Sequence, residues 1–224
     1  MIRFERVSKR FDGNRALADI SFRLQPGEMA FLTGHSGAGK STLLRLISML
    51  ERATGGQILV NNRNLRKIKR RAIPRHRRQI GMIYQDHQLL ADKSVFDNVA
   101  LPLVIDGVRF GEIRRQVAAS LDRVGLRLKE KSYPGALSGG EQQRIGIARA
   151  IVTQPPLLLA DEPTGNLDPE LSADLMNLFC TLNEAGATVL IASHDLALIR
   201  QLGKRVLVLK SGKLVDDIAA AEVG

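Results

Sequence analysis

The chain lacks the features that would place it across a membrane or in an oxidising compartment. It has 224 residues, no tryptophan and a single cysteine, Cys180, so it cannot form an internal disulfide. A lone cysteine favours a reducing compartment. No apolar run approaches the roughly 18 to 20 residues that cross a bilayer, and the first six residues contain no apolar signal-peptide core. We therefore expect a cytoplasmic chain without a transmembrane segment of its own.

Acidic residues are missing from one part of the chain, and the overall charge is strongly positive. The formal net charge is +10, and the segment 61–79 contains no acidic residue. Its basic residues are Arg63, Arg66, Lys67, Lys69, Arg70, Arg71, Arg75, Arg77 and Arg78. Two interpretations stay open: a solvated surface, or a surface near an anionic membrane, where each basic residue contributes about 1 kcal/mol. The segment has no aromatic residue for base stacking, so no specific nucleic-acid partner is expected.

Hydrophobic periodicity indicates one α/β domain. The composition, with 44% hydrophobic residues, is that of a globular chain. Short apolar runs predict strands at 1–7, 17–24, 29–33, 80–84, 157–160, 188–192, 205–209 and 213–216. Between about 86 and 155 the pattern becomes helical, with apolar residues on one helical face from Ile113 to Val124. We therefore predict an α/β core at 1–85 and 156–224, with a helical subdomain inserted at about 86–155.

A glycine-rich segment follows the strand expected at 29–33 and precedes a helix expected at 41–50. It consists of Gly34, His35, Ser36, Gly37, Ala38, Gly39, Lys40, Ser41 and Thr42. Glycines let successive backbone N–H groups turn toward phosphate oxygens, and the positive end of the following helix adds to this attraction. Lys40 can reach the β- and γ-phosphates of a nucleotide, and the Ser41 hydroxyl can ligate Mg²⁺. The segment therefore predicts a nucleotide phosphate loop.

Several polar residues follow expected strands, and each also has a purely structural explanation. Asp161 at the end of an apolar strand would hold Mg²⁺ through water, and Glu162 would polarise the attacking water. Two such acids can also merely end a strand and begin a turn. Gln85 could contact both Mg²⁺ and the water, and His194 could bond a γ-phosphate, although either could be an ordinary turn or edge residue. Asp168 is explained as the N-cap of a helix.

The segment 137–142, Leu-Ser-Gly-Gly-Glu-Gln, together with the phosphate loop, favours the functional explanation of these polar residues over the structural one. It resembles the signature sequence of ABC-type ATPases, and the resemblance covers essentially the whole chain. In that family the signature of one subunit completes the ATP site of another, which implies a homodimer that ATP closes. The resemblance assigns contacts with the opposite subunit's ATP to Ser138, Gly139, Gly140 and Gln142. The segment 165–168 resembles the family's D-loop, which spans the dimer interface, and this implies that Asp168 lies at that interface.

The same resemblance implies roles for the polar residues and a fold. Gln85 matches the Q-loop glutamine, which also contacts the metal, while Glu162 matches the catalytic glutamate and His194 the switch histidine. Phe11 falls where the family keeps an aromatic residue that stacks on adenine, although tyrosine is frequent there. The implied fold has a phosphate-loop core with a mainly parallel sheet, an antiparallel β part near the N-terminus and an inserted helical subdomain. The implied activity is Mg²⁺-dependent ATP hydrolysis.

The region around Gln85 resembles one branch of the family most closely. The segments 77–83 and 85–90 are similar to those of ABC-type ATPases that act in bacterial cell division. That likeness implies a peripheral protein on the cytoplasmic face of the inner membrane, with an integral membrane partner docked near 85–97. The alternative is the ATPase subunit of a transporter or lipoprotein-release complex. ATPases of nucleic-acid maintenance carry two ATPase halves or a long coiled coil between the two motifs, and the interval 40–138 has neither.

Overall fold

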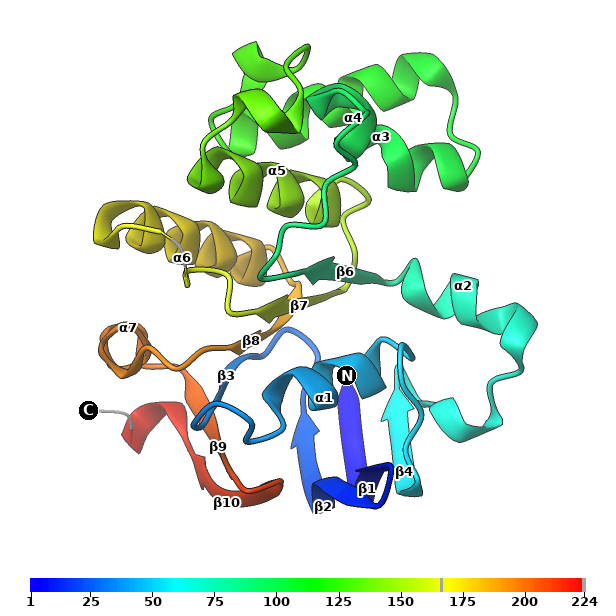
Figure 1. Ribbon diagram of the computed structural model, residues 1–224, viewed down its shortest axis with the longest axis vertical. Helices are drawn as coiled ribbons and strands as arrows, with labels where there is room; N and C mark the ends of the chain where they lie inside the picture. Colours follow the sequence, from blue (N-terminus) through cyan, green and yellow to red (C-terminus); the bar gives the residue numbers. More distant parts are fainter. Residues whose placement is uncertain (166, 223–224) are drawn as a thin grey trace.

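The computed structural model describes residues 1–165 and 167–222, which form two sheets (Figure 1). The smaller sheet is antiparallel and has the order β2-β1-β4-β5. Its strands are β1 (Ile2–Phe11), β2 (Asn14–Leu24), β4 (Gly55–Val60) and β5 (Arg63–Asn64). Side chains along β1 and β2 alternate between buried and exposed, as expected when one face of a sheet is covered. Phe4 and Phe22 stack across the two strands with ring centroids 4.7 Å apart.

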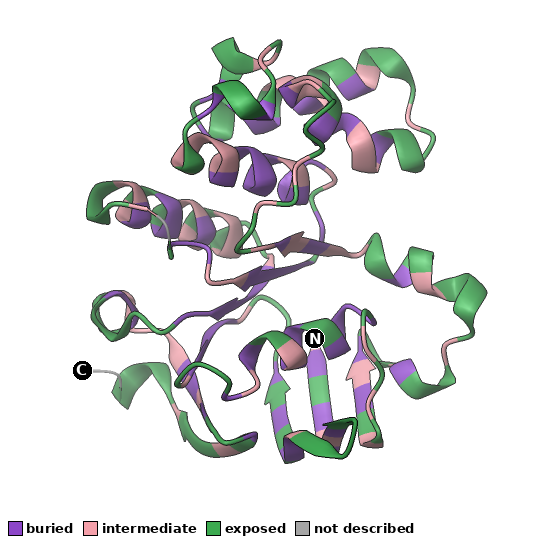
Figure 2. Cartoon of the chain, in the orientation of Figure 1, coloured by how far each residue is buried: buried purple, intermediate pink, exposed green. Residues whose placement is uncertain are grey.

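The larger sheet is mainly parallel and carries the polar residues that follow its strands. Its order is β10-β9-β3-β8-β7-β6, and only the edge pair β9 and β10 is antiparallel. The strands are β3 (Met29–Thr33), β6 (Ile80–Ile83), β7 (Leu157–Asp161), β8 (Thr188–Ala192), β9 (Arg205–Lys210) and β10 (Lys213–Ile218). Every residue of β3 and β8 is buried, which explains their continuous apolar runs (Figure 2).

Helices cover both sides of this sheet. They are α1 (Lys40–Ile47), α2 (Ile73–Arg77), α3 (Val95–Ile105), α4 (Phe110–Arg123), α5 (Gly139–Ile151), α6 (Pro169–Glu184) and α7 (Leu196–Leu202). α1 buries its leucines between the two sheets in one apolar core. α3, α4 and α5 lie together at the top of Figure 1 and share a second core with α6. In the described part of the chain, no helix is both long and apolar enough to cross a bilayer.

Most of the expected strands and helices are present, and the differences between their predicted and observed bounds show where the sequence pattern is not sufficient. The strands expected at 29–33 and 188–192 have those bounds, because each is wholly buried and ends at a polar loop. β1 continues to Phe11, four residues beyond the expected end, because β2 pairs with it up to Asn14. The first helix of the region that starts at 86 begins only at Val95, after a loop. How the chain divides into subdomains stays a prediction.

The buried face of α6 is not the face that its leucines define. The regular spacing of Leu171, Leu175, Leu178 and Leu182 suggests that these residues point inward, but only Leu175 among them is fully buried. The helix instead packs through Ser172, Leu175, Met176 and Phe179. The other leucines are half-buried beside an open pocket between α4, α5 and α6. The two stripes differ by a small rotation of the helix, which sequence spacing alone does not resolve.

This rotation predicts unequal effects of two neighbouring substitutions. Phe179→Ala removes a fully buried ring and should lower the free energy of unfolding by about 3–5 kcal/mol. Leu178→Ala removes a half-buried side chain at the pocket and should cost less than about 2 kcal/mol. Urea unfolding followed by circular dichroism would measure both. Equal losses, or a larger loss for Leu178→Ala, would contradict the observed packing of α6.

Candidate nucleotide site

The phosphate loop lies between β3 and α1, and its backbone requires glycine at two positions. Gly34 has φ +150°, and a Cβ there would lie 2.2 Å from the Leu209 carbonyl oxygen. Gly39 has φ +107°, and its Cβ would lie 2.6 Å from Leu17 Cδ2. No other residue fits at either position without moving a neighbouring strand. His35 also stabilises the loop, since its Nδ1 lies 2.7 Å from the Ser36 carbonyl oxygen.

α1 presents an uncapped N-terminus at this loop. Its N-cap is Gly39, which has no side chain to accept from the first N–H groups, and the first turn has no acidic residue. The N–H groups of Lys40, Ser41 and Thr42 lie in the first turn, where a helix offers them no acceptor. Together with the positive end of the helix they form an anion site. The Lys40 ammonium donates to the Gly34 carbonyl oxygen at 2.8 Å, so it lies across the same loop.

Ser41 and Asp161 bring two hard oxygen donors together. The Ser41 hydroxyl donates to Asp161 Oδ1 at 3.1 Å, close to the roughly 3 Å between adjacent ligands of an octahedral Mg²⁺. Burial raises the pKa of Asp161, and the hydrogen bond from Ser41 partly offsets this. In residues 1–165 and 167–222, this region included, no cluster of three His, Cys, Asp or Glu side chains could hold a metal. The donors present therefore fit Mg²⁺, which needs few protein ligands when water and phosphate supply the others.

Glu162 connects the phosphate loop to His194. Its Oε1 lies 3.3 Å from the Lys40 ammonium, and its Oε2 lies 2.8 Å from His194 Nδ1. The Glu162 side chain is only 12% exposed, whereas that of His194 is 70% exposed. Glu162 also has φ +48°, a left-handed conformation that costs a non-glycine residue roughly 1 kcal/mol or more. A carboxylate held in this strained position, between a lysine and a histidine, has the placement expected of a group that acts on a water near a phosphate.

Strand order explains how distant residues meet at this place. β3, β8, β7 and β6 are adjacent and parallel, so their carboxyl ends lie along one edge of the sheet. The phosphate loop follows β3, His194 follows β8, and Glu162 follows β7. Gln85 follows β6 and is exposed beyond its end. The structure thus pairs Lys40 with Glu162 and Glu162 with His194. It also pairs Ser41 with Asp161. Gln85 follows β6, the strand next to β7.

Phe11 and Asp168 occupy positions at the margins of this region. Phe11 ends β1 with 37% of its surface exposed, and the Lys9 ammonium lies 4.3 Å from the ring centroid. Asp168 accepts from the Leu171 N–H at 2.9 Å and is the N-cap of α6, as the sequence predicts. Asn166, in the segment similar to a D-loop, lies outside the described residues.

The signature residues begin α5 and do not reach the phosphate loop of their own chain. Ser138 is the N-cap, and with Glu141 it forms a capping box in which each side chain accepts from the other's backbone. Gln142 donates its side-chain amide to the carbonyl oxygens of Pro134 and Leu137, so it holds the preceding turn. Among residues 1–165 and 167–222 no hydrogen bond or ion pair joins the segment 138–142 to the phosphate loop.

α5 also holds the loop that follows Gln85, through residues that the sequence analysis does not single out. The Arg149 guanidinium donates to the His87 and Gln88 carbonyl oxygens at 2.8 and 2.7 Å. Gln143, on the same helix, is hydrogen-bonded to the His87 ring. Both His87 and Gln88 have positive φ, and burial lowers the pKa of Arg149. The one sequence signal is an arginine within the apolar run Ile-Ala-Arg-Ala-Ile at 147–151.

Loss of Arg149 should lower the rate of ATP hydrolysis without lowering the affinity for the nucleotide to the same extent. Arg149→Ala removes two hydrogen bonds from a charged donor, each worth about 1.5–3 kcal/mol, and so frees the loop after Gln85. We expect the ATP hydrolysis rate to fall at least about tenfold, which corresponds to 1.4 kcal/mol, while the Kd for a fluorescent ATP analogue changes less than about threefold. Arg115→Ala is the control, because Arg115 is exposed and pairs with Glu112 on α4. An equal loss of affinity, or full activity, would contradict the coupling.

Comparison with known proteins gives the same result as the geometry. The family model described as "ABC transporter" matches residues 17–165. The "Cell division ATP-binding protein FtsE" of Escherichia coli (strain K12) is 57% identical over 96% of this chain and 97% of its own length. The protein of that name from Bacillus subtilis (strain 168) is 43% identical over 100% of this chain and 99% of its own.

Solved structures of ATP-binding cassettes have the same fold. The dimeric structure of MJ0796, described as a bacterial ABC transporter cassette, has a TM-score of 0.93 and 32% identity, and covers 98% of this chain and 99% of that one. A dimeric post-hydrolysis state of the same cassette, bound to ADP and Pi, has a TM-score of 0.92 and 31% identity with the same coverage. The chain belongs to the ABC transporter family and is one of its ATP-binding cassette ATPases.

Proposed function

We propose that this ATPase is the nucleotide-binding subunit of a membrane complex similar to FtsE–FtsX, in which ATP closes a homodimer and the motion controls septal cell-wall hydrolysis. The relatives named as cell-division proteins support the cellular role. The observation that carries the mechanism is that the phosphate loop and the signature lie in one chain without touching each other. In this proposal a second copy supplies the signature to each ATP, which agrees with the dimeric state of solved cassettes of this fold.

In this mechanism the first turn of α1 and Lys40 bind the phosphates. The Lys40 ammonium, now on the Gly34 carbonyl oxygen, turns to the β- and γ-phosphates, while Phe11 stacks on the adenine. Ser41 would hold Mg²⁺, with Asp161 acting through a water and Gln85 completing the set. When bound there, the ion would supply positive charge next to the phosphate oxygens.

Glu162 and His194 then act on either side of the attacking water. Glu162 orients the water and accepts its proton, a step that typically contributes about 10²–10⁴-fold. His194, whose ring now bonds Glu162, turns to the γ-phosphate of the bound nucleotide. The opposite subunit supplies the Ser138 hydroxyl and the N–H groups of Gly139 and Gly140, at the positive end of its α5. Gln142 supports this turn from within its own chain, and Asp168 lies at the dimer interface.

The membrane partner docks in a groove beside the Gln85 loop. This groove, of about 500 Å³, lies between α2, β6, α3 and α5 and includes Gln88 and Leu90. Leu90 and Ile105 on its rim are 40% and 58% exposed, an apolar surface suited to a partner protein. Since Arg149 both lines the groove and bonds Gln88, a shift of α5 on dimer closure reaches the partner. Such a complex places the chain on the cytoplasmic face of the bacterial inner membrane, bound peripherally through an integral membrane protein similar to FtsX.

Depletion of the protein in its own bacterium tests the cellular role. At low osmolarity we expect filaments with stalled septa, scored by cell length, because septal cell-wall hydrolysis loses its ATP-driven control. A wild-type copy should restore division, and Glu162→Gln should not, since it removes the proton acceptor. Glu170→Gln is the matched control, because Glu170 is an exposed acid at the start of α6.

A different phenotype would favour the alternative function. Normal division together with mislocalised lipoproteins, or with loss of a transported substrate, would assign the ATPase to a transporter or lipoprotein-release complex. The ATP site would be the same in that case, because only the partner in the groove differs.

A further inference from the structure

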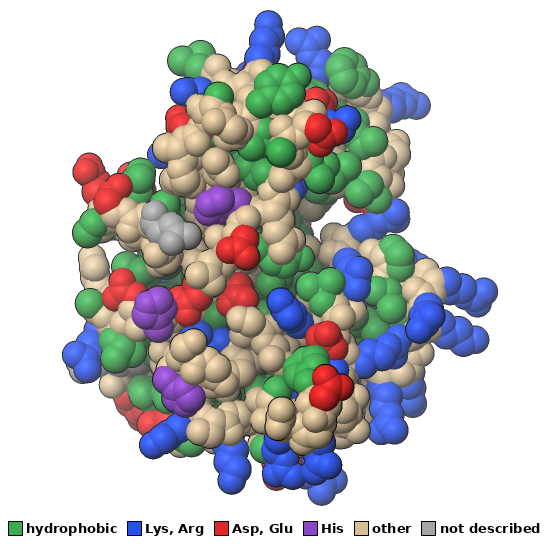
Figure 3. Space-filling model, viewed as in Figure 1, with side chains coloured by type: hydrophobic (Ala, Val, Ile, Leu, Met, Phe, Trp, Pro, Cys, Tyr) green, Lys and Arg blue, Asp and Glu red, His purple; other side chains and the backbone are tan. Residues whose placement is uncertain are grey.

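The residues between β4 and β6 carry a concentration of positive charge that the ATP site does not use. We define the basic surface as the exposed side chains of Arg63, Arg66, Lys67, Lys69, Arg70, Arg71, Arg75, Arg77 and Arg78. They lie on β5, on the 3₁₀ turns Leu65–Lys67 and Arg70–Ala72 and on α2, except that Lys69 precedes the second turn and Arg78 follows α2. Lys and Arg side chains gather on the side of the molecule where Figure 1 places α2 (Figure 3).

Most of these charges have no counter-charge among the residues that the structure describes. Arg78 pairs with Asp106 at 2.7 Å, and Arg77 donates to the Ser48 and Met49 carbonyl oxygens at 3.2 and 2.9 Å. None of the other seven side chains forms an ion pair with any of the described residues. An ordinary solvated surface mixes charges of both signs. A surface on which seven positive side chains lie together, with no acidic side chain paired to them, matches an extended anionic partner.

The segment is anchored to the core by groups on its inner side. Leu65 is buried, Ile68 and Ile73 pack against the core, and His76 is buried against the end of α1. His76 Nε2 lies 2.7 Å from the Ile47 carbonyl oxygen. Burial lowers the pKa of His76, as does the nearby charge of Arg77, while the hydrogen bond to Ile47 raises it. The basic side chains therefore extend from a segment that is packed against the core.

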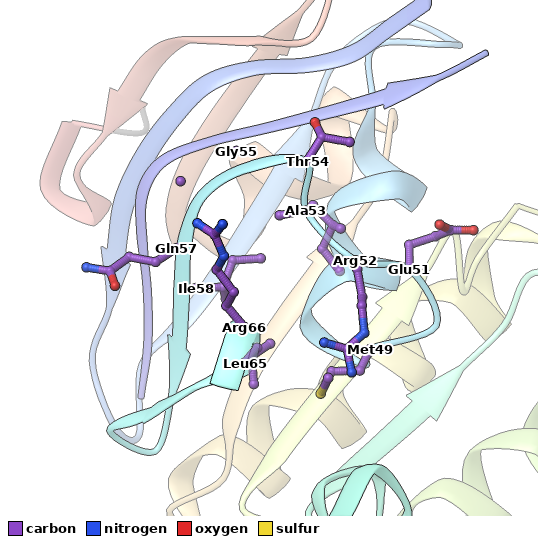
Figure 4. Close-up of a pocket in the computed structure, with 12 residues that line it drawn as sticks. Met49, Glu51, Arg52, Ala53, Thr54, Gly55, Gln57, Ile58, Leu65 and Arg66 are labelled. Carbon is purple, nitrogen blue, oxygen red and sulfur yellow. The ribbon is translucent and has the colours of Figure 1, made fainter. Parts of the chain in front are cut away.

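The shape of this surface does not suit a small phosphate ligand. At its amino-terminal end a pocket lies between the loop after α1, β4 and the turn at Leu65, with Arg52 and Arg66 among its lining side chains (Figure 4). Its volume is about 90 Å³, well below the roughly 300–1,000 Å³ of ligand pockets. Arg77 and Arg78 line the groove proposed for the membrane partner, and the other basic side chains are exposed outside both pockets. An extended anionic surface, such as an array of lipid headgroups, matches this arrangement.

The basic surface is also next to the groove proposed for the membrane partner. Pro74, Arg77 and Arg78 belong to α2 or follow it, and they line the same groove as Pro102 and Ile105 of α3. A membrane protein seated there brings the lipid surface beside α2. The position of the basic surface thus agrees with its charge.

We propose that the basic surface binds the anionic phospholipid headgroups of the membrane that holds the partner, so that the ATPase rests on the lipid as well as on the protein. The orientation of the ATPase relative to the membrane rests on the proposed function, but the binding of lipid by the basic surface does not need the partner. The absence of aromatic side chains from 61–79 disfavours single-stranded nucleic acid, whose bases stack on such side chains, and a DNA duplex is left to the test.

Co-sedimentation with vesicles tests this binding with the purified full chain alone. The vesicles contain phosphatidylcholine, either pure or with about one third phosphatidylglycerol. We expect binding to the anionic vesicles only, weakened by high salt because salt screens exposed charges. The variant K67Q/K69Q/R70Q/R75Q should bind at least about tenfold more weakly, since each basic residue near an anionic surface contributes roughly fivefold.

A second variant, R109Q/R114Q/R123Q/K131Q, removes the same charge from exposed positions outside the basic surface. It should bind anionic vesicles within about twofold of the wild type. Equal losses in both variants would show attraction by net charge alone and overturn the proposal, as would failure to bind anionic vesicles. Tighter binding to a DNA duplex than to the vesicles would overturn it in favour of nucleic acid. The assay contains neither nucleotide nor partner, so its result is independent of the division phenotype.

Discussion

The parallel pairing of β3, β8, β7 and β6 is the constraint on which the site depends. It places the ends of four strands at one edge, so that a loop, an acid pair, a histidine and a glutamine that are far apart in sequence become neighbours. The contacts among Lys40, Glu162 and His194 follow from this order. A change in strand order would scatter them even if every motif were intact.

The chain contains two incomplete halves of an ATP site, and α5 connects one of them to the groove. Its N-terminus carries the signature, while Gln143, directly after the signature, and Arg149, near the other end, hold the loop after Gln85. Under the proposed function, movement of the signature onto a second subunit's ATP would therefore move the wall of the groove. The basic surface borders that groove through Arg77 and Arg78, so the sites proposed for the nucleotide, the partner and the lipid adjoin one another.

The sequence predicts the local parts of this arrangement well and the long-range parts poorly. The buried strand at 29–33 and the glycine loop after it follow from local pattern, and the N-cap at Asp168 follows from its side chain and the next proline. The order of the strands in the sheet does not follow from local pattern, because residues that pair across the sheet are far apart in the sequence. The sequence marks Arg149 only as an arginine in an apolar run and does not reveal its acceptors, which are backbone carbonyls more than sixty residues away. The rotation of α6 is missed because two apolar stripes share one helix.

The central claim is that each ATP site is built from two chains, and mixing two inactive variants tests it most directly. Lys40→Ala removes the phosphate lysine, and Ser138→Arg blocks the signature. A dimer of either variant has two defective sites, but a mixed dimer has one site with both defects and one with none. The account predicts that each variant alone is inactive, and that an equal mixture recovers up to about a quarter of the wild-type rate for random pairing. Full activity of Ser138→Arg alone, or no recovery in the mixture, would contradict it.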